Sequence, residues 1–208
     1  MEKPKKILVV GGAGYVGAVL IREMLERGYA IKVLDRLFYG TVGLDDIKDK
    51  VELIVGDIRS FNPNILDDVE AVINLSGLSN DPTAEYNPEA NYEMNTVATA
   101  KLAQICKQKG VRRFIFASSC SIYDIGETNE DKDIIFDETA PVAPKAAYSR
   151  SKYEAEKLLL AMQDENFSPV ILRKGTVYGF SPRMRYDLVV NTFLKDALTK
   201  GKISLYFG

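Results

Sequence analysis

Short runs of apolar residues alternate along the chain with longer segments in which apolar residues recur every three to four positions. The runs predict strands, and the recurring pattern predicts helices. We expect strands at residues 6–10, 31–34, 51–55, 71–75, 113–117, 170–172 and 203–207. We expect helices at residues 15–27, 92–110, 147–162 and 187–199. Apolar strands separated by helices predict an α/β fold with a doubly wound parallel sheet.

The charge balance narrows the range of partners. The net charge of the 208 residues is -2, so nothing in the composition favours binding to nucleic acid or to an anionic membrane. No apolar run is long enough to cross a bilayer. Residues 1–5 lead straight into the first strand without the pattern of a cleaved signal. We therefore expect a cytoplasmic protein.

The chain contains no histidine, which restricts its possible chemistry. Ser-His-Asp and Cys-His triads and histidine-ligated metal sites are excluded, and we expect no metal. Cys106 and Cys120 lie too far apart for a CxxC motif, and we expect both to be small buried residues. Proton transfer must then use carboxylates, lysine, tyrosine or cysteine.

The first expected strand is followed by the sequence GGAGYVG, which opens the first expected helix. One glycine permits a tight turn, one lets the backbone approach a pyrophosphate, and one lets helix and strand pack closely. The start of the helix directs unpaired N–H groups at the phosphates. We expect the diphosphate of a dinucleotide to be held by Gly11, Gly14, Tyr15, Val16 and Gly17.

An acidic residue, Asp35, ends the second strand. A carboxylate there accepts hydrogen bonds from the adenosine ribose and repels a 2′-phosphate, which favours NAD over NADP. Arg36 acts the other way, because an arginine can accommodate a 2′-phosphate, so NADP stays open as the less favoured cofactor. Asp57, with Ile58 beside it, follows the third strand. It either accepts a hydrogen bond from the adenine amino group or simply ends the strand in a turn.

Tyr148 and Lys152 are four residues apart and share one face of a helix. A nearby ammonium stabilises a phenolate, which makes tyrosine a usable general base. Tyr153 and Lys157 repeat the spacing, but at ~100° per residue they fall on the opposite, solvent-facing side. The first pair shares the apolar stripe with Ser151, Ala155, Leu158, Leu159 and Met162. A lysine on such a stripe needs a task or a partner, unless it reaches the solvent from the edge.

A run of hydroxyl residues, SSCSIY at 118–123, ends the fifth strand. Hydroxyls there lie where ligands bind in a doubly wound sheet, although a serine-rich strand end is by itself more typical of a turn. In this order, the glycine motif, Asp35, residues 118–123, Tyr148-x-x-x-Lys152 and residues 173–179 resemble the extended short-chain dehydrogenase/reductases, the NAD-dependent epimerase/dehydratase group. The resemblance covers essentially the whole chain.

The resemblance implies a Rossmann-type domain, NAD and a nucleotide-diphosphate sugar as substrate. It implies that Tyr148 takes the proton of a sugar hydroxyl while hydride passes to NAD, that Lys152 holds the nicotinamide ribose and favours the phenolate, and that Ser119 is the catalytic Ser/Thr. The remaining residues that it places along the cofactor are Leu75, Ser76, Gly77 and Asn95.

Three departures from the family pattern bear on the reaction. The 4,6-dehydratase branch carries Asp-Glu where this chain has Cys120 and Ser121, which disfavours dehydration. The UDP-galactose 4-epimerase branch has Gly-Leu-Lys where this chain has Gly-Leu-Ser79, and many members have an asparagine that touches substrate at Thr176. Arg183 and Arg185 either contact a diphosphate or are solvated loop cations. The candidate substrate contacts are thus Ser79, Ser121, Thr176, Arg183 and Arg185.

The leading hypothesis is an NAD-dependent nucleotide-sugar epimerase. The alternatives are a nucleotide-sugar reductase or dehydratase using NAD(P), and a non-catalytic NAD-binding regulator. We expect residues 1–180 to form the NAD-binding domain with the catalytic residues, and residues 181–208 to begin a substrate-binding region that is truncated. The resemblance also implies a homodimer formed through the helices at 92–110 and 147–165.

Overall fold

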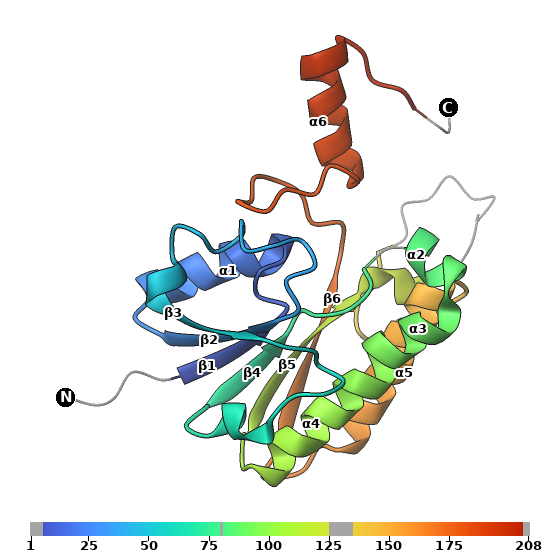
Figure 1. Ribbon diagram of the computed structural model, residues 1–208. Helices are drawn as coiled ribbons and strands as arrows, with labels where there is room; N and C mark the ends of the chain where they lie inside the picture. The colour runs from blue at the N-terminus through green and yellow to red at the C-terminus, as the bar shows by residue number, and fades with distance from the viewer. Residues whose placement is uncertain (1–5, 80, 125–134, 206–208) are drawn as a thin grey trace.

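The computed structural model describes residues 6–79, 81–124 and 135–205, and within them six strands form one parallel sheet (Figure 1). The strands are β1 (Lys6–Val10), β2 (Ala30–Asp35), β3 (Val51–Val55), β4 (Ala71–Asn74), β5 (Arg113–Ser119) and β6 (Ser168–Lys174). Their order is β3-β2-β1-β4-β5-β6. The direction of winding reverses between β1 and β4, which is where a doubly wound sheet places its ligand. The predicted fold class is confirmed.

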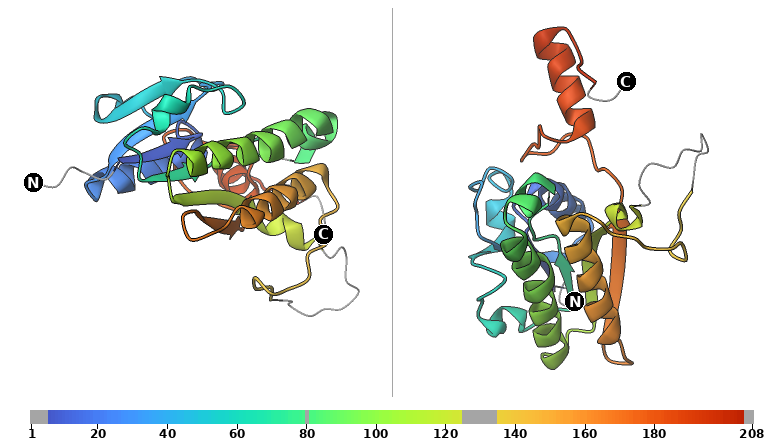
Figure 2. Two further views of the ribbon diagram at one scale, coloured as in Figure 1. Left: turned by 90° about the horizontal axis from the view of Figure 1, so that it is seen from below. Right: turned by 90° about the vertical axis from the view of Figure 1, so that its right-hand side faces the viewer.

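Helices cover both faces of the sheet. The helices are α1 (Tyr15–Glu26), α2 (Asp81–Tyr86), α3 (Pro88–Tyr92), α4 (Ala98–Gln108), α5 (Ala147–Ala161) and α6 (Val189–Lys200). Short 3-10 turns lie at η1 (Lys48–Lys50), η2 (Pro63–Leu66) and η4 (Cys120–Tyr123). α1 packs on one face, and α4 and α5 lie side by side on the other (Figures 1 and 2). Within the ranges given above, no helix has the length and apolar character needed to span a membrane.

Two apolar clusters hold these layers together. Alternate residues of a strand point to opposite faces of the sheet. Leu8 and Val10 therefore pack with Phe114 and Phe116 beneath α4 and α5, and Ile7 and Val9 belong to the cluster beneath α1. The apolar strand runs in the sequence reflect this burial on both sides.

The long helix expected at 92–110 is built from three pieces. It begins at Pro88, because the Asn87 side chain accepts a hydrogen bond from the Ala90 N–H at 3.0 Å and caps the first turn. A π turn, η3 (Glu93–Val97), then separates α3 from α4. The expected helix was thus right in position but wrong in its start and its regularity.

The strand expected at 203–207 is wrong as far as the structure describes it. Residues 203–205 form no strand, and 206 and 207 lie outside the described residues. α6 projects away from the sheet (Figure 2), and none of the six strands in the described part of the chain pairs with residues 203–205 to form a ladder. The expected burial of Cys120 is also wrong: Cys106 is buried, but Cys120 is exposed in the η4 turn at the end of β5.

Candidate active site

The glycine loop between β1 and α1 lies at the switch point of the sheet. Gly11 has a φ of +79° and donates its N–H to the Leu34 carbonyl at 2.8 Å. A Cβ at Gly17 would lie 2.6 Å from the Cα of Gly12. The first glycine therefore permits the turn, and the last lets α1 pack directly on the loop.

Gly14 and the start of α1 fit a phosphate ligand. A Cβ at Gly14 would lie 3.3 Å from the Gly11 carbonyl oxygen, a tight contact with the main chain, so the loop favours a residue without a side chain there. α1 begins with Tyr15 and Val16, without a side-chain cap and without an acidic residue in its first turn. The first N–H groups of a helix have no acceptor within it, and they favour an anion. The loop therefore fits the diphosphate of a dinucleotide.

Asp35 connects the end of β2 to this loop. Its carboxylate accepts hydrogen bonds from the N–H of Ala13 at 3.0 Å and of Leu37 at 2.8 Å. The guanidinium of Arg36 is bound by other residues: it pairs with Asp57 at 3.0 Å and stacks 4.1 Å from the centre of the Phe38 ring. Asp35, rather than Arg36, is therefore held beside the glycine loop.

The carboxylate of Asp57 is paired with two nearby arginines, Arg36 and Arg59. Arg59 donates to both of its carboxylate oxygens, at 2.7–3.1 Å, and these hydrogen bonds hold the pKa of Asp57 below its usual value. The Arg59 N–H also donates to it at 2.9 Å, as in a strand-end turn. Ile58 buries its side chain in the core, so only its main chain is left to meet a ligand.

Lys152 is buried at the carboxyl end of β5, with only 4% of its surface exposed. Its Nζ donates to the Ala117 carbonyl at 3.0 Å and lies 5.8 Å from the centre of the Tyr148 ring. Burial, followed by the charge of Lys174, lowers the pKa of Lys152 to about 7, and Glu156 opposes the shift. By contrast, the side chain of Lys157 is half exposed and pairs with Glu154 at 2.6 Å.

The loop after β4 meets this lysine. A Cβ on Gly77 would lie 2.3 Å from Asn95 Oδ1 and 3.5 Å from Lys152 Nζ. Asn95, in the π turn, accepts from the Leu78 N–H at 2.9 Å and donates to the Leu78 carbonyl at 3.0 Å, which fixes the loop. The structure thus brings together Gly77, Asn95 and Lys152, three residues that the resemblance places along the cofactor. In the same loop, Leu75 packs against the apolar cluster beneath α1, and the Ser76 hydroxyl donates a hydrogen bond to the Asn74 side chain at 2.6 Å.

Ser119 ends β5 and caps the η4 turn. Its hydroxyl oxygen accepts hydrogen bonds from the N–H of Ser121 at 3.2 Å and from the Ser121 hydroxyl at 2.9 Å. In the register of the sheet Ser119 pairs with Lys174, so both side chains leave the sheet on the same face. Ser119 therefore lies on the edge that carries Gly77 and Lys152.

Besides Ser121, the candidate substrate residues lie on the segments that follow β4 and β6. Arg185 donates to the Ser79 hydroxyl at 3.1 Å and pairs with Asp187 at 2.5 Å. The guanidinium of Arg183 stacks 3.7 Å from the centre of the Tyr39 ring. Neither arginine is thus an isolated loop cation. Thr176 is exposed.

A buried ionic network that was not expected from the sequence lies behind Ser119. Glu156 is 1% exposed and receives hydrogen bonds from Arg173 at 2.8 and 3.1 Å and from the Ser118 hydroxyl. Arg173 also donates to the Tyr123 hydroxyl at 2.7 Å, and the contacts with Glu156 raise its pKa. A signal was available, because Glu156 lies four residues after Lys152 on the same predicted buried stripe.

The sheet order, the glycine loop and the Tyr–Lys pair together define the short-chain dehydrogenase/reductase class, in its extended form. A family model described as "NAD dependent epimerase/dehydratase family" matches residues 7–207. The chain therefore belongs to the NAD-dependent epimerase/dehydratase family. Among the described residues, no group of three or more metal-ligating side chains is positioned to hold an ion.

Individual relatives agree with this assignment. The chain is 26% identical over 209 residues to UDP-glucuronic acid decarboxylase 1 of Danio rerio, covering 97% of this chain and 48% of the relative. It is 30% identical over 193 residues to UDP-glucose 4-epimerase of Bacillus subtilis, covering 86% and 55%. The structure of Thermus thermophilus UDP-glucose 4-epimerase in complex with NAD superposes with a TM-score of 0.81, at 28% identity, covering 94% of this chain and 63% of that chain.

Proposed function

We propose that this chain binds NAD across the switch point between β1 and β4 and epimerises a nucleotide-diphosphate sugar. The observation that carries the proposal is the place of Lys152. Lys152 is an almost fully buried amine 5.8 Å from the Tyr148 ring, beside Gly77 and at the end of the strand that carries Ser119. A buried lysine is costly without a task, and this one faces the edge where a doubly wound sheet binds its ligand.

NAD is the favoured cofactor, and NADP is less favoured. The loop and first helical turn at Gly11, Gly14, Tyr15, Val16 and Gly17 would hold the diphosphate, and Asp35 the adenosine ribose. Because Arg36 is paired with Asp57, it is less available to a 2′-phosphate. When bound, NAD would accept a hydride from the sugar carbon and return it.

The residues of the chain would move the proton. Ser119 would donate a hydrogen bond to the oxygen of the reacting hydroxyl and orient it. Tyr148 would take the hydroxyl proton as the C–H bond gives up its hydride, which leaves a keto-sugar. Lys152 would stabilise the phenolate by its charge. Return of the hydride to the opposite face, with the proton from Tyr148, gives the epimer without net oxidation.

The reaction is tested by incubating the purified chain with NAD and either UDP-glucose or UDP-glucuronic acid, and following the sugar protons by NMR. We expect an epimer to form without net NADH. Tyr148→Phe should lower the rate at least about 10²-fold, the lower end of general acid–base contributions. The matched control, Tyr153→Phe, makes the same change on the solvent-facing side of α5 and should retain the rate.

Two outcomes would contradict the proposal. If Tyr148→Phe left turnover unchanged, the catalytic assignment would be wrong, and an NAD-binding regulator would be the better description. If NADH accumulated in proportion to product, the protein would be a net oxidoreductase rather than an isomerase.

We further infer a cytoplasmic homodimer that pairs through α3, α4 and α5. Large apolar side chains are exposed on these elements and on η3 between them: Tyr92 at 47%, Val97 at 49% and Leu160 at 48%. We also propose that residues 1–180 form the NAD-binding domain and that residues 181–208 begin the substrate-binding region. Light scattering on the purified chain should give twice the monomer mass, and Val97→Glu should halve it. A wild-type monomer at micromolar concentration would contradict this inference.

A further inference from the structure

The segment that joins β6 to α6 is tied to the first residue of α1. The Tyr15 hydroxyl donates to the Gly179 carbonyl at 2.6 Å and accepts a hydrogen bond from Asn191 Nδ2 at 3.0 Å. The Ser181 hydroxyl donates to the main-chain carbonyl of Tyr15 at 2.8 Å. These contacts span more than 160 residues of sequence, and Ser181 and Asn191 are 1% and 6% exposed.

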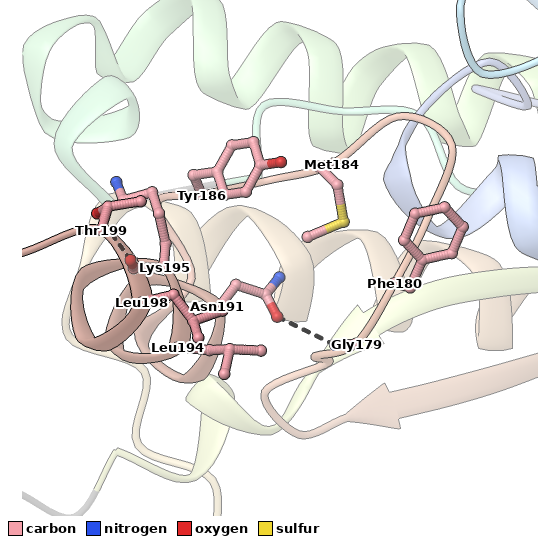
Figure 3. Close-up of a pocket in the computed structure, with 9 residues that line it drawn as sticks. All are labelled: Gly179, Phe180, Met184, Tyr186, Asn191, Leu194, Lys195, Leu198 and Thr199. Atoms are coloured by element: carbon pink, nitrogen blue, oxygen red, sulfur yellow. Dashed lines mark hydrogen bonds between the residues drawn. The ribbon is translucent and has the colours of Figure 1, made fainter. Parts of the chain in front are cut away.

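Asn191, which belongs to α6, makes further hydrogen bonds to the same segment. Its Oδ1 accepts a hydrogen bond from the Gly179 N–H at 3.0 Å (Figure 3). Its Nδ2 also donates to the Arg185 carbonyl at 2.9 Å. Its amide thus holds both ends of the loop at 179–185. Buried polar groups whose hydrogen bonds are all made fix one conformation, because any alternative leaves a donor or acceptor without a partner.

The anchored loop and α6 line a partly open cavity of about 340 Å³. The cavity is lined by Gly179, Phe180, Met184, Tyr186, Asn191, Leu194, Lys195, Leu198 and Thr199. Figure 3 shows the Asn191 side chain reaching from α6 toward Gly179, with Tyr186 and Met184 beside it on the loop. The position of this cavity relative to the glycine loop therefore depends on the hydrogen bonds at Tyr15.

We propose that Tyr15 is a positioning residue that couples the cofactor site to the substrate site. Its main chain belongs to the helical turn that would meet the cofactor diphosphate, and its hydroxyl holds the wall of the substrate-side cavity. Binding of NAD fixes α1 and the glycine loop, which favours the orientation of Gly179 and Asn191 that receives the nucleotide sugar. The proposal rests on the proposed function, because it takes NAD and a nucleotide sugar as the two ligands.

Coupling between two sites is reciprocal, so it is measured as a change in one affinity caused by the other ligand. In titrations of the purified chain by calorimetry, NAD should raise the affinity for UDP-glucose in the wild type. Tyr15→Phe removes only the hydroxyl. It should raise the Kd of UDP-glucose about five- to tenfold, change the Kd of NAD less than twofold and abolish the coupling. Tyr29→Phe is the matched control, since the Tyr29 hydroxyl makes no hydrogen bond within the described part of the chain.

A second variant tests whether the effect passes through Asn191. Asn191→Leu should weaken UDP-glucose binding to a similar extent, and the double variant should be no weaker than the worse single variant. Hydrogen–deuterium exchange gives a readout without any ligand: residues 179–200 should exchange faster in Tyr15→Phe than in Tyr29→Phe.

The outcomes separate this inference from the proposed function. If the wild type binds neither NAD nor UDP-glucose, the proposed function fails, and the coupling fails with it. If the wild type binds both and Tyr15→Phe changes neither the UDP-glucose affinity nor the exchange of residues 179–200, the proposed function stands and the coupling is wrong. An equal loss of NAD and UDP-glucose affinity would also overturn it, because Tyr15 would then serve the cofactor site alone.

Discussion

Arg173 of β6 and Glu156 of α5 form an ion pair between strand and helix at 2.8 Å, with only 18% and 1% of their side chains exposed. The pair joins β6 to α5. β6 continues into the anchored loop, and α5 carries Tyr148 and Lys152. Its hydrogen bonds extend to Ser118 and Tyr123, so the end of β5 is fixed by the same group.

Removing one partner of this pair should destabilise the fold strongly. Arg173→Met leaves the buried Glu156 carboxylate without its counter-charge, which typically costs about 3–5 kcal/mol. The control is Arg113→Met, because Arg113 pairs with Glu70 at the surface, where an ion pair contributes about 0–1 kcal/mol. Urea unfolding of both variants measures the difference. Equal losses in the two variants would contradict the structural role given to Glu156.

Lys152 should give the protein a defined dependence of stability on pH. Below pH 7 the folded and unfolded chains both hold the proton of this lysine. Above the folded pKa of about 7 the folded form releases it, while the unfolded form keeps it up to the ordinary value of 10.5. The free energy of unfolding, relative to Lys152→Met, should therefore rise with pH between about 7 and 10.5, by up to about 1.4 kcal/mol per pH unit.

This dependence is measured by urea unfolding of both proteins from pH 6 to pH 9. Lys174→Met should delay the rise to higher pH, because the nearby ammonium of Lys174 lowers the pKa of Lys152. A difference between wild type and Lys152→Met that stays constant from pH 6 to pH 9 would show that Lys152 is not desolvated in solution.

The close packing at Gly17 should tolerate no side chain. In Gly17→Ala the added methyl would lie 2.6 Å from main-chain atoms of Gly12, which cannot move aside without displacing the loop. Overpacking of this kind costs about 1–3 kcal/mol. Gly175→Ala is the control, since its Cβ would meet nothing within 4 Å and its φ is not in the left-handed region. Thermal unfolding and NAD titration of the two variants should both separate them, and a stable Gly17→Ala protein with wild-type NAD affinity would contradict the packing.

Asp35 should decide between the two nicotinamide dinucleotides. Asp35→Asn removes the charge that repels a 2′-phosphate, so the ratio of the NADP and NAD dissociation constants should fall about tenfold, which corresponds to about 1.4 kcal/mol. Fluorescence titration with both reduced cofactors gives the ratio, with the exposed Asp45→Asn as the control. An unchanged ratio would show that selectivity arises elsewhere.

Much of the fold could be predicted because apolar runs report burial on both faces of a parallel strand. β1 and β3 have the expected bounds, and β2 and β6 extend slightly beyond them. The pattern failed at residues 203–205, since an apolar run says nothing about whether a partner strand is present. It also failed at Cys120, because hydrophobic character does not reveal that the strand has already ended.

Residues of the candidate site could be predicted from the sequence only where the local sequence pattern by itself explains the residue type. Glycines that avoid a clash and a lysine on an apolar stripe are such cases. The hydrogen bonds of Tyr15 with Gly179 and Asn191 were not foreseen, because they join positions more than 160 residues apart, and helix spacing carries no information about them. The pairing of Arg36 with Asp57 likewise depends on how two neighbouring strands end.

The π turn at Glu93–Val97 makes the length of its segment as important as its composition. A π turn accommodates one more residue than an α turn, and each residue of a helix is rotated by about 100° from the last. Inserting a further residue here would turn α3 relative to α4, carrying Asn91 away from the Ala147 carbonyl, to which it donates at 3.1 Å, and Asn95 away from Leu78. Insertions in this segment should consequently be tolerated far less readily than substitutions on its solvent-facing side.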